Sequence, residues 1–345
     1  MKKLLLLLLM PFILSGCTPN TQEEITFSSW GSVSEVKILN HIIADFENEN
    51  PNIKIKFMHI PQNYFQKIHL LFASNTAPDV IFINNLNLPI YENYLEDLSQ
   101  EINKKDFYPQ ALEGLSSNGK LLAIPRDVSN VVFYINLDII SSKPNSNWTL
   151  DDFLQIAQKS TKNGIYGVSF EEDVYWALPY LQAFGENLLA GSEFKGLEYY
   201  KDLRDKYKVA PSRSQIGSST LAQMFLDKKI AMYLSGRWMY PKIKEKADFN
   251  WTIVNFPSQN GVPADSSGWA ISKNSKHKDS AKKFIKYLSS EQSSEYFAKT
   301  GLIIPARIET SNLIEEKVFI EAIQSSTPTP VNKEYKKITD KYKLH

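Results

Sequence analysis

The stretch Ala77–Asn84, APDVIFIN, places four consecutive apolar residues, Val80–Ile83, directly after a proline and an aspartate. A continuous apolar run of this length is typical of a strand buried on both faces, as in parallel sheets covered by helices. Upstream, Ile25–Ser28 and Ile53–Phe57 alternate apolar and polar residues, which predicts two further strands. The three runs together suggest one sheet.

Apolar residues at helical spacing fill the two gaps between these strands. The two predicted helical faces are Val36, Leu39, Ile42, Ile43 and Phe46, then Phe65, Ile68, Leu71 and Phe72. The resulting β-α-β-α-β order predicts the opening of a doubly wound α/β sheet. Ligands bind beyond the carboxyl ends of strands in such sheets. Those ends fall at Ser29-Trp30, Gln62–Tyr64 and Asn84-Asn85.

The rest of the chain repeats this alternation. Strands are expected near 131–135, 165–170, 230–234 and 251–256, and an amphipathic helix over Lys278–Leu288. A chain of 345 residues is long enough for two lobes. Its formal charge of +1 gives no reason to expect nucleic acid as a partner.

The amino terminus is read separately from the fold. Lys2 and Lys3 precede an apolar run, Leu4–Leu14, that is too short to span a bilayer, so residues 1–16 are expected to be a signal peptide. The run ends in Leu-Ser-Gly-Cys, which resembles a bacterial lipoprotein signal with Cys17 as the lipidated residue. Cys17 is the only cysteine, which excludes a disulfide within one molecule. Residues 17–24 are expected to form a polar tether.

Motifs of several enzyme classes are absent from the sequence. It contains no phosphate-binding glycine loop, no H-E-x-x-H and no G-x-S-x-G, and its histidines are scattered. Glu171-Glu172-Asp173 is a candidate carboxylate pair for glycoside hydrolysis. Neighbouring carboxylates at a strand end point in different directions, which favours a solvated loop instead. We therefore predict no catalytic residue, no metal site and no cofactor.

Aromatic residues at predicted strand ends, turns and helix starts point to another chemistry. They are Trp30, Trp176, Trp238 and Trp269, with Tyr64 and Tyr175 in comparable positions. Each tryptophan has a plain structural alternative, because tryptophan is often a boundary residue. An aromatic face also stacks on the C–H face of a sugar ring, whose hydroxyls pair with polar groups. Matching loop positions hold Asn84, Asn85, Asp127, Asn130, Asp173 and Arg237.

Several ordered motifs resemble the extracellular solute-binding proteins of bacterial ABC importers, family 1, the group of the maltose-binding protein. They are ITFSSWG from Ile25, APDVIFIN, GKLLAIP (119–125), AMYLSGRW (231–238), SGWAISKNSKHKDSAKKFIKYLSSEQ (267–292), IPAR (304–307) and PTPVNKEYKKI (328–338). The resemblance implies a two-lobe periplasmic-binding-protein fold of class α/β. Each lobe is then a doubly wound, mainly parallel sheet flanked by helices, and crossing hinge segments join the lobes. Lobe one would comprise 25–123 plus 258–308, and lobe two 124–257 plus 309–345.

The resemblance also implies a function and partners. We expect a lipid-anchored, monomeric, extracytoplasmic receptor that binds a mono- or oligosaccharide and delivers it to the permease subunits of an ABC transporter. Trp238 falls on the stacking tryptophan of the family, and Asp173 and Tyr175 fall on sugar-contacting positions. Ile83 departs from a lobe-one tryptophan, so Asn84 and Asn85 are expected to contribute hydrogen bonds there.

Three alternatives stay open at this point. If Arg237 and Arg307 both line the cleft, the ligand is a phosphorylated or acidic solute, such as a glycerol phosphodiester or a uronate. The acidic run Glu171–Asp173 leaves a secreted glycosidase open. A surface adhesin without a cleft is the third alternative.

Overall fold

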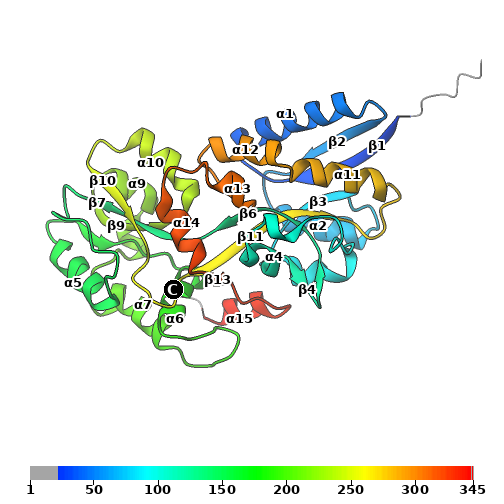
Figure 1. Cartoon of the computed structure of the whole chain (residues 1–345). Coiled ribbons are helices and arrows are strands. Elements are labelled where there is room, and N and C mark those ends of the chain that lie inside the picture. The colour runs from blue at the N-terminus through cyan, green and yellow to red at the C-terminus, as the bar shows by residue number, and fades with distance from the viewer. Residues whose placement is uncertain (1–21, 343, 345) are drawn as a thin grey trace, which may run out of the picture.

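The structure is a computed structural model that describes residues 22–342 and 344. The predicted signal peptide and Cys17 lie outside the described residues. The first described elements confirm the predicted β-α-β-α-β order, and β1 pairs in parallel with both β2 and β3. Figure 1 shows these strands in one half of the molecule, flanked by α1, α2 and α11.

The strands of the described chain are β1 (Glu23–Ser29), β2 (Ile53–His59), β3 (Val80–Asn84), β4 (Ser116–Ser117), β5 (Lys120–Leu121), β6 (Ile124–Ser129), β7 (Val132–Asn136), β8 (Tyr166–Val168), β9 (Ile230–Ser235), β10 (Trp251–Val254), β11 (Pro263–Ile271), β12 (Ile304–Pro305) and β13 (Thr327–Pro328). The α-helices are α1 (Val33–Glu49), α2 (Tyr64–Ala73), α3 (Leu88–Tyr91), α4 (Pro109–Gly114), α5 (Leu150–Ser160), α6 (Leu178–Ala183), α7 (Lys195–Asp205), α8 (Arg213–Ile216), α9 (Leu221–Leu226), α10 (Tyr240–Lys246), α11 (Lys278–Leu288), α12 (Glu291–Lys299), α13 (Ile308–Ser311), α14 (Lys317–Gln324) and α15 (Tyr335–Lys341). Short 3₁₀ turns are η1 (Glu92–Tyr94), η2 (Lys104–Asp106), η3 (Val174–Ala177) and η4 (Arg237–Met239).

Lobe one is built on a seven-stranded sheet of order β12-β6-β11-β3-β1-β2, with β13 paired to β11. In this sheet β1 is parallel to both β2 and β3, and β11 is parallel to β13. Strand β11 runs antiparallel to both β3 and β6. The polarity follows from the connections between lobes. Strand β6 leaves towards lobe two, whereas β11 returns from it, so the two must run in opposite directions.

Lobe two is built on a four-stranded sheet of order β10-β7-β9-β8. Here the expectation of a mainly parallel sheet is wrong, because β10–β7 and β7–β9 are antiparallel and only β8–β9 is parallel. The physical reason is again the point at which the chain crosses from one lobe to the other. Strand β7 enters from lobe one, with Val132 opposite Ser235 at the end of β9, so it begins where β9 ends.

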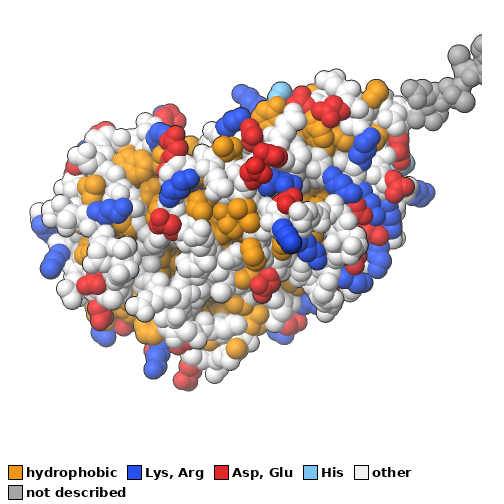
Figure 2. Space-filling model, viewed as in Figure 1, with side chains coloured by type: hydrophobic (Ala, Val, Ile, Leu, Met, Phe, Trp, Pro, Cys, Tyr) orange, Lys and Arg blue, Asp and Glu red, His pale blue; other side chains and the backbone are white. Residues whose placement is uncertain are grey.

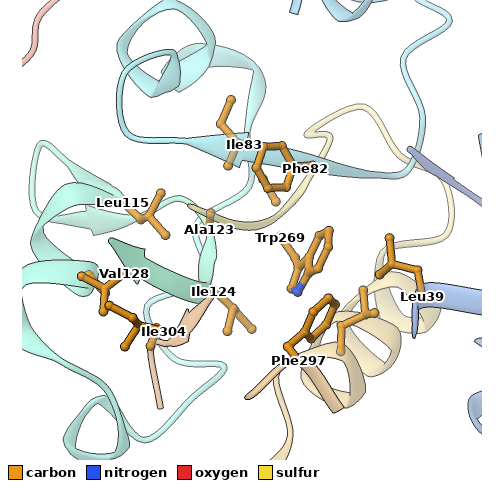
Figure 3. Close-up of a cluster of buried hydrophobic side chains, with 14 of the residues drawn as sticks. Leu39, Phe82, Ile83, Leu115, Ala123, Ile124, Val128, Trp269, Phe297 and Ile304 are labelled. Carbon is orange, nitrogen blue, oxygen red and sulfur yellow. The ribbon is translucent and has the colours of Figure 1, made fainter. Parts of the chain in front are cut away.

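Both sheets are covered on both faces by apolar side chains. In β7, Tyr134 belongs to one buried cluster, whereas its neighbours Phe133 and Ile135 belong to the cluster on the other face. Helix α11 buries Ala281, Phe284, Ile285 and Leu288, the face predicted from its spacing. Figure 3 shows part of the lobe-one core, where Trp269 lies among Phe82, Leu39 and Phe297.

The strand pairings differ from the lobe boundaries expected from the sequence. Strand β6 pairs within the lobe-one sheet, so the chain leaves that sheet after Ser129 and not after Ala123. Strand β13, expected in lobe two, also pairs with lobe one, whereas Tyr335 of α15 packs into the lobe-two core. Within residues 22–342 and 344, no helix has the length and apolarity needed to cross a bilayer.

Candidate functional site

A cavity of about 440 Å³ lies where the two lobes meet. Lobe one lines it beyond the ends of β1 and β3, two of the three strand ends predicted from topology, and with β6 and the start of β11. The third predicted strand end, Gln62–Tyr64 after β2, does not line the cavity. Lobe two contributes Tyr175 from η3 and Arg237 and Trp238 from η4. The cavity is therefore lined by both lobes, and we call it the interlobe pocket.

The lobe-one wall contains a buried arginine. The Arg126 guanidinium pairs with the Asp127 carboxylate and lies 3.6 Å from Glu35 Oε1. It also lies over the rings of Phe82 and Trp269, at 5.0 and 5.5 Å from their centroids. The Asp127 carboxylate accepts a second hydrogen bond from the Ser267 hydroxyl. This network fixes Asp127 in the wall of the pocket.

A second lobe-one carboxylate, Asp265, connects both lobes. Its Oδ1 accepts a hydrogen bond of 3.0 Å from the Asn85 amide, and its Oδ2 accepts one from the Tyr175 hydroxyl of lobe two. Burial, followed by the charge of Asp265, raises the pKa of Tyr175. Tyr175 therefore stays a neutral hydroxyl donor at physiological pH.

The lobe-two wall follows the buried strand β9. Ser235-Gly236 ends the strand, and the Trp238 ring folds back over Gly236 so closely that a Cβ there would lie 2.0 Å from ring carbon Cζ3. Arg237 is buried, donates to the Ile303 carbonyl and lies 3.8 Å from Glu316. Burial lowers its pKa, which the Glu316 carboxylate opposes. Arg237 thus braces the turn against lobe one.

The structure brings seven of the predicted site residues to the interlobe pocket. They are Trp30, Asn84, Asn85, Asp127, Tyr175, Arg237 and Trp238. The two tryptophans come from different lobes, and each is exposed, Trp30 by 46% and Trp238 by 38%. Exposed indole faces at a concave site are available for stacking.

Two predicted aromatic residues are core residues instead, which corrects the expectation for them. Trp269 is fully buried and packs edge-on against Phe27 and Phe82. Tyr64 is buried, and its hydroxyl exchanges hydrogen bonds with Ser28 and the Phe82 backbone. Both belong to the lobe-one core, and neither lines the interlobe pocket.

Four further predicted residues lie outside the pocket. Asn130 is buried and donates to the Phe319 carbonyl, and Asp173 caps η3 through the Tyr175 amide. Trp176 packs edge-on against Tyr175 and does not line the pocket. Arg307 pairs with Asp106 at 3.0 Å and covers the ring of Phe107. Each side chain is committed to a structural contact.

Sequence reasoning missed three charged residues of the pocket wall, Glu35, Arg126 and Asp265. Arg126 adjoins the predicted Asp127, and Asp265 lies just before the SGWAISK motif. Their positions next to these motifs could have identified both as candidates. Glu35 could have been found from the S-x-x-E pattern of Ser32 and Glu35, which forms the capping box at the start of α1.

The pocket wall holds charges of both signs, and so does the outer surface. Figure 2 shows acidic and basic side chains interspersed over the face in view. Among the described residues, no three His, Cys, Asp or Glu side chains are grouped so as to hold a metal ion. What the pocket can do chemically is stack two indole faces and exchange hydrogen bonds.

Comparison with known proteins gives consistent matches. The family of bacterial extracellular solute-binding proteins matches residues 41–318. The maltodextrin-binding protein MdxE of Bacillus subtilis is 23% identical over 85% of this chain and 77% of its own length. A maltooligosaccharide ABC transporter solute-binding lipoprotein of Streptococcus pneumoniae is 22% identical over 62% of this chain and 57% of its own.

Among solved structures, an ABC substrate-binding protein of Listeria monocytogenes, in complex with cycloalternan, superposes with a TM-score of 0.81. It is 24% identical to this chain, and the match covers 92% of this chain and 91% of that one. At this identity the likeness shows the fold, which is the two-lobe arrangement described above.

Proposed function

Because the chain belongs to the bacterial extracellular solute-binding proteins, we propose that it binds a neutral sugar in the interlobe pocket and delivers it to the permease of an ABC transporter. The observation that carries this proposal is the pairing of two exposed tryptophans, one from each lobe, with hydrogen-bonding groups in one cavity. Membership of the family places its function outside the cytoplasm.

The polar groups suit a ligand rich in hydroxyls. Asp127 and Asp265 present carboxylate oxygens that accept from hydroxyls, and Asn84 supplies an amide that can donate and accept. Charge-assisted hydrogen bonds from fixed groups provide orientation, and the indole faces provide apolar area. The relatives named for maltodextrin and maltooligosaccharide binding support an α-glucan-like ligand, and a panel of sugars has to identify it.

Charge balance in the pocket argues against an anionic solute. The two guanidiniums, Arg126 and Arg237, already lie beside Asp127, Glu35 and Glu316. Asp265 adds another carboxylate to the wall, and Arg307, on which the anionic alternative depended, lies elsewhere. An added phosphate or carboxylate would therefore meet net negative charge.

The glycosidase alternative loses its geometric basis. Glu171, Glu172 and Asp173 line a separate cavity on lobe two, with Arg213 and Asp340. They do not face the interlobe pocket, where a sugar is expected to stack. The family and the named relatives are binding proteins, which agrees with a receptor and not with a hydrolase.

Membrane attachment through Cys17 is part of the proposal. The Leu-Ser-Gly-Cys sequence motivates it, and one relative is named as a lipoprotein. Two or more acyl chains would anchor the protein stably. Membrane fractionation tests this step, because a Cys17→Ser variant that stays in the membrane fraction would refute it.

Calorimetry with the purified protein tests the binding function. The titrants are neutral mono- and oligosaccharides, including maltodextrins, beside glycerol phosphodiesters and uronates. Loss of one stacking face in Trp238→Ala is expected to weaken sugar binding by about 1–3 kcal/mol. The control is Phe184→Ala, an aromatic residue on lobe two that is exposed but does not line the pocket. Equal affinities of Trp238→Ala and the wild type would remove Trp238 from the site.

A further inference from the structure

The hydrogen bond between Tyr175 and Asp265 crosses the interlobe pocket from lobe two to lobe one. We propose that this bond is a latch that stabilises the closed arrangement of the lobes, and so sets the apparent affinity for sugar. The effect on affinity rests on the proposed function, whereas the effect on closure does not.

The lobe-one half of the latch is rigid. Asn85 is fully buried, its backbone amide donates to the Ser266 carbonyl at 2.9 Å, and its side-chain oxygen accepts from the Ser266 amide at 3.1 Å. Its remaining amide group donates to Asp265. The Asp265 carboxylate is therefore held in one orientation by lobe one alone, with its other oxygen directed to Tyr175.

The lobe-two half is held almost as firmly. Tyr175 lies in η3, whose first turn is capped by the Asp173 carboxylate through the Tyr175 amide at 2.9 Å. Its ring packs edge-on against Trp176, with the ring centroids 5.5 Å apart. Neither Asp173 nor Trp176 lines the pocket, and their contacts explain what they do instead: they aim the Tyr175 hydroxyl at Asp265.

Donor and acceptor roles in this bond are fixed. Tyr175 remains a hydroxyl donor, and a carboxylate acceptor makes the hydrogen bond charge-assisted and stronger than a neutral one. Its two halves belong to different lobes, so any movement that separates Tyr175 from Asp265 breaks the bond. It therefore shifts the open–closed equilibrium towards closure.

Ligand affinity is linked to this equilibrium. When only the closed state completes the site, the apparent dissociation constant scales inversely with the closed population. A second crossing contact, from Arg237 to the Ile303 carbonyl, involves neither Tyr175 nor Asp265. Removal of the Tyr175 hydroxyl should therefore reduce closure without separating the lobes completely.

The test measures the distance between the lobes in Tyr175→Phe, which lacks only the hydroxyl. Spin labels at Leu70→Cys on lobe one and Glu198→Cys on lobe two report the distance, in a Cys17→Ser background that removes the only native cysteine. Both labelled sites are exposed. In the ligand-free protein, Tyr175→Phe is expected to lower the ratio of closed to open molecules about tenfold, as for loss of a charge-assisted hydrogen bond.

Tyr94→Phe is the matched control, because Tyr94 is an exposed lobe-one tyrosine away from the pocket. An unchanged distance distribution in ligand-free Tyr175→Phe would overturn the latch, whether or not any sugar binds. Asp265→Asn retains an acceptor oxygen and is expected to open the lobes less than Tyr175→Phe. If no sugar binds but Tyr175→Phe still opens the protein, the proposed function fails and the latch stands.

Discussion

The two walls of the interlobe pocket are built differently. On lobe one, Arg126, Asp127, Asn85 and Asp265 are bonded to one another or to neighbouring strands, and the first three are buried. On lobe two, Trp238 projects from a short 3₁₀ turn and is partly exposed. The lobe-one wall is thus a preformed set of hydrogen-bonding groups, whereas the lobe-two wall offers an aromatic face that its turn positions.

This difference suggests a division of labour in binding. A rigid polar wall selects the pattern of hydroxyls, because its groups cannot rearrange to suit a poor ligand. A side chain on a turn contributes stacking area and can adjust as the lobes close. Substitutions of Arg126 or Asp127 in the first wall should therefore damage the fold together with binding, whereas substitution of Trp238 in the second wall should mainly weaken binding.

The largest expected effect compares two tryptophans. Trp269→Ala should lower the free energy of unfolding by about 3–5 kcal/mol, because it leaves a cavity among Phe27, Phe82 and Phe297. Trp238→Ala removes a partly exposed ring and should cost about 1 kcal/mol or less. Urea denaturation of both variants measures these losses. Similar losses for the two would show that the buried lobe-one tryptophan and the pocket tryptophan of lobe two do not differ in their structural role as described.

The next effect concerns the buried arginine of lobe one. Arg126→Met should lower the free energy of unfolding by about 3 kcal/mol, because Asp127 keeps its charge without its partner. Arg307→Met is the control, since its partner Asp106 is 36% exposed, and a cost of about 1 kcal/mol or less is expected. Adding Asp127→Asn to Arg126→Met should recover part of the loss in the same denaturation assay. A double variant less stable than Arg126→Met would contradict the unpaired-charge explanation.

Local patterns were enough to predict much of the fold. The run Val80–Ile83 is a buried strand, and the spacing in Lys278–Leu288 predicted the buried face of α11. Strand polarity in lobe two could not be predicted in this way, because it depends on where β7 enters the sheet from lobe one. That is a property of the crossing and not of any residue in β7.

The candidate site was predictable to a smaller extent for a related reason. Trp30 and Trp269 both lie close to strands, and their sequence neighbourhoods do not show which one points outward. Trp269 lies in β11 opposite Phe82 of the central strand β3, so its ring enters the core, whereas Trp30 follows the end of β1. The role of Asp265 could not be predicted from its sequence neighbourhood either, because it depends on contacts with Asn85 and Tyr175, which are distant in sequence.

The smallest effect tests how the lobe-two wall holds its tryptophan. Gly236 has φ −99° and ψ −174°, which alanine adopts without strain, so Gly236→Ala acts only through its methyl group. That methyl would occupy the space of the Trp238 ring and displace it from the pocket. Sugar affinity, measured by calorimetry, should fall by about 1 kcal/mol, at most the loss caused by Trp238→Ala. In a Trp238→Ala background the same glycine substitution should have no further effect on affinity, since the ring it displaces is gone. Additive losses in the double variant would mean that Gly236 contributes to binding through its own backbone, as a close approach to the ligand, and not by seating the indole.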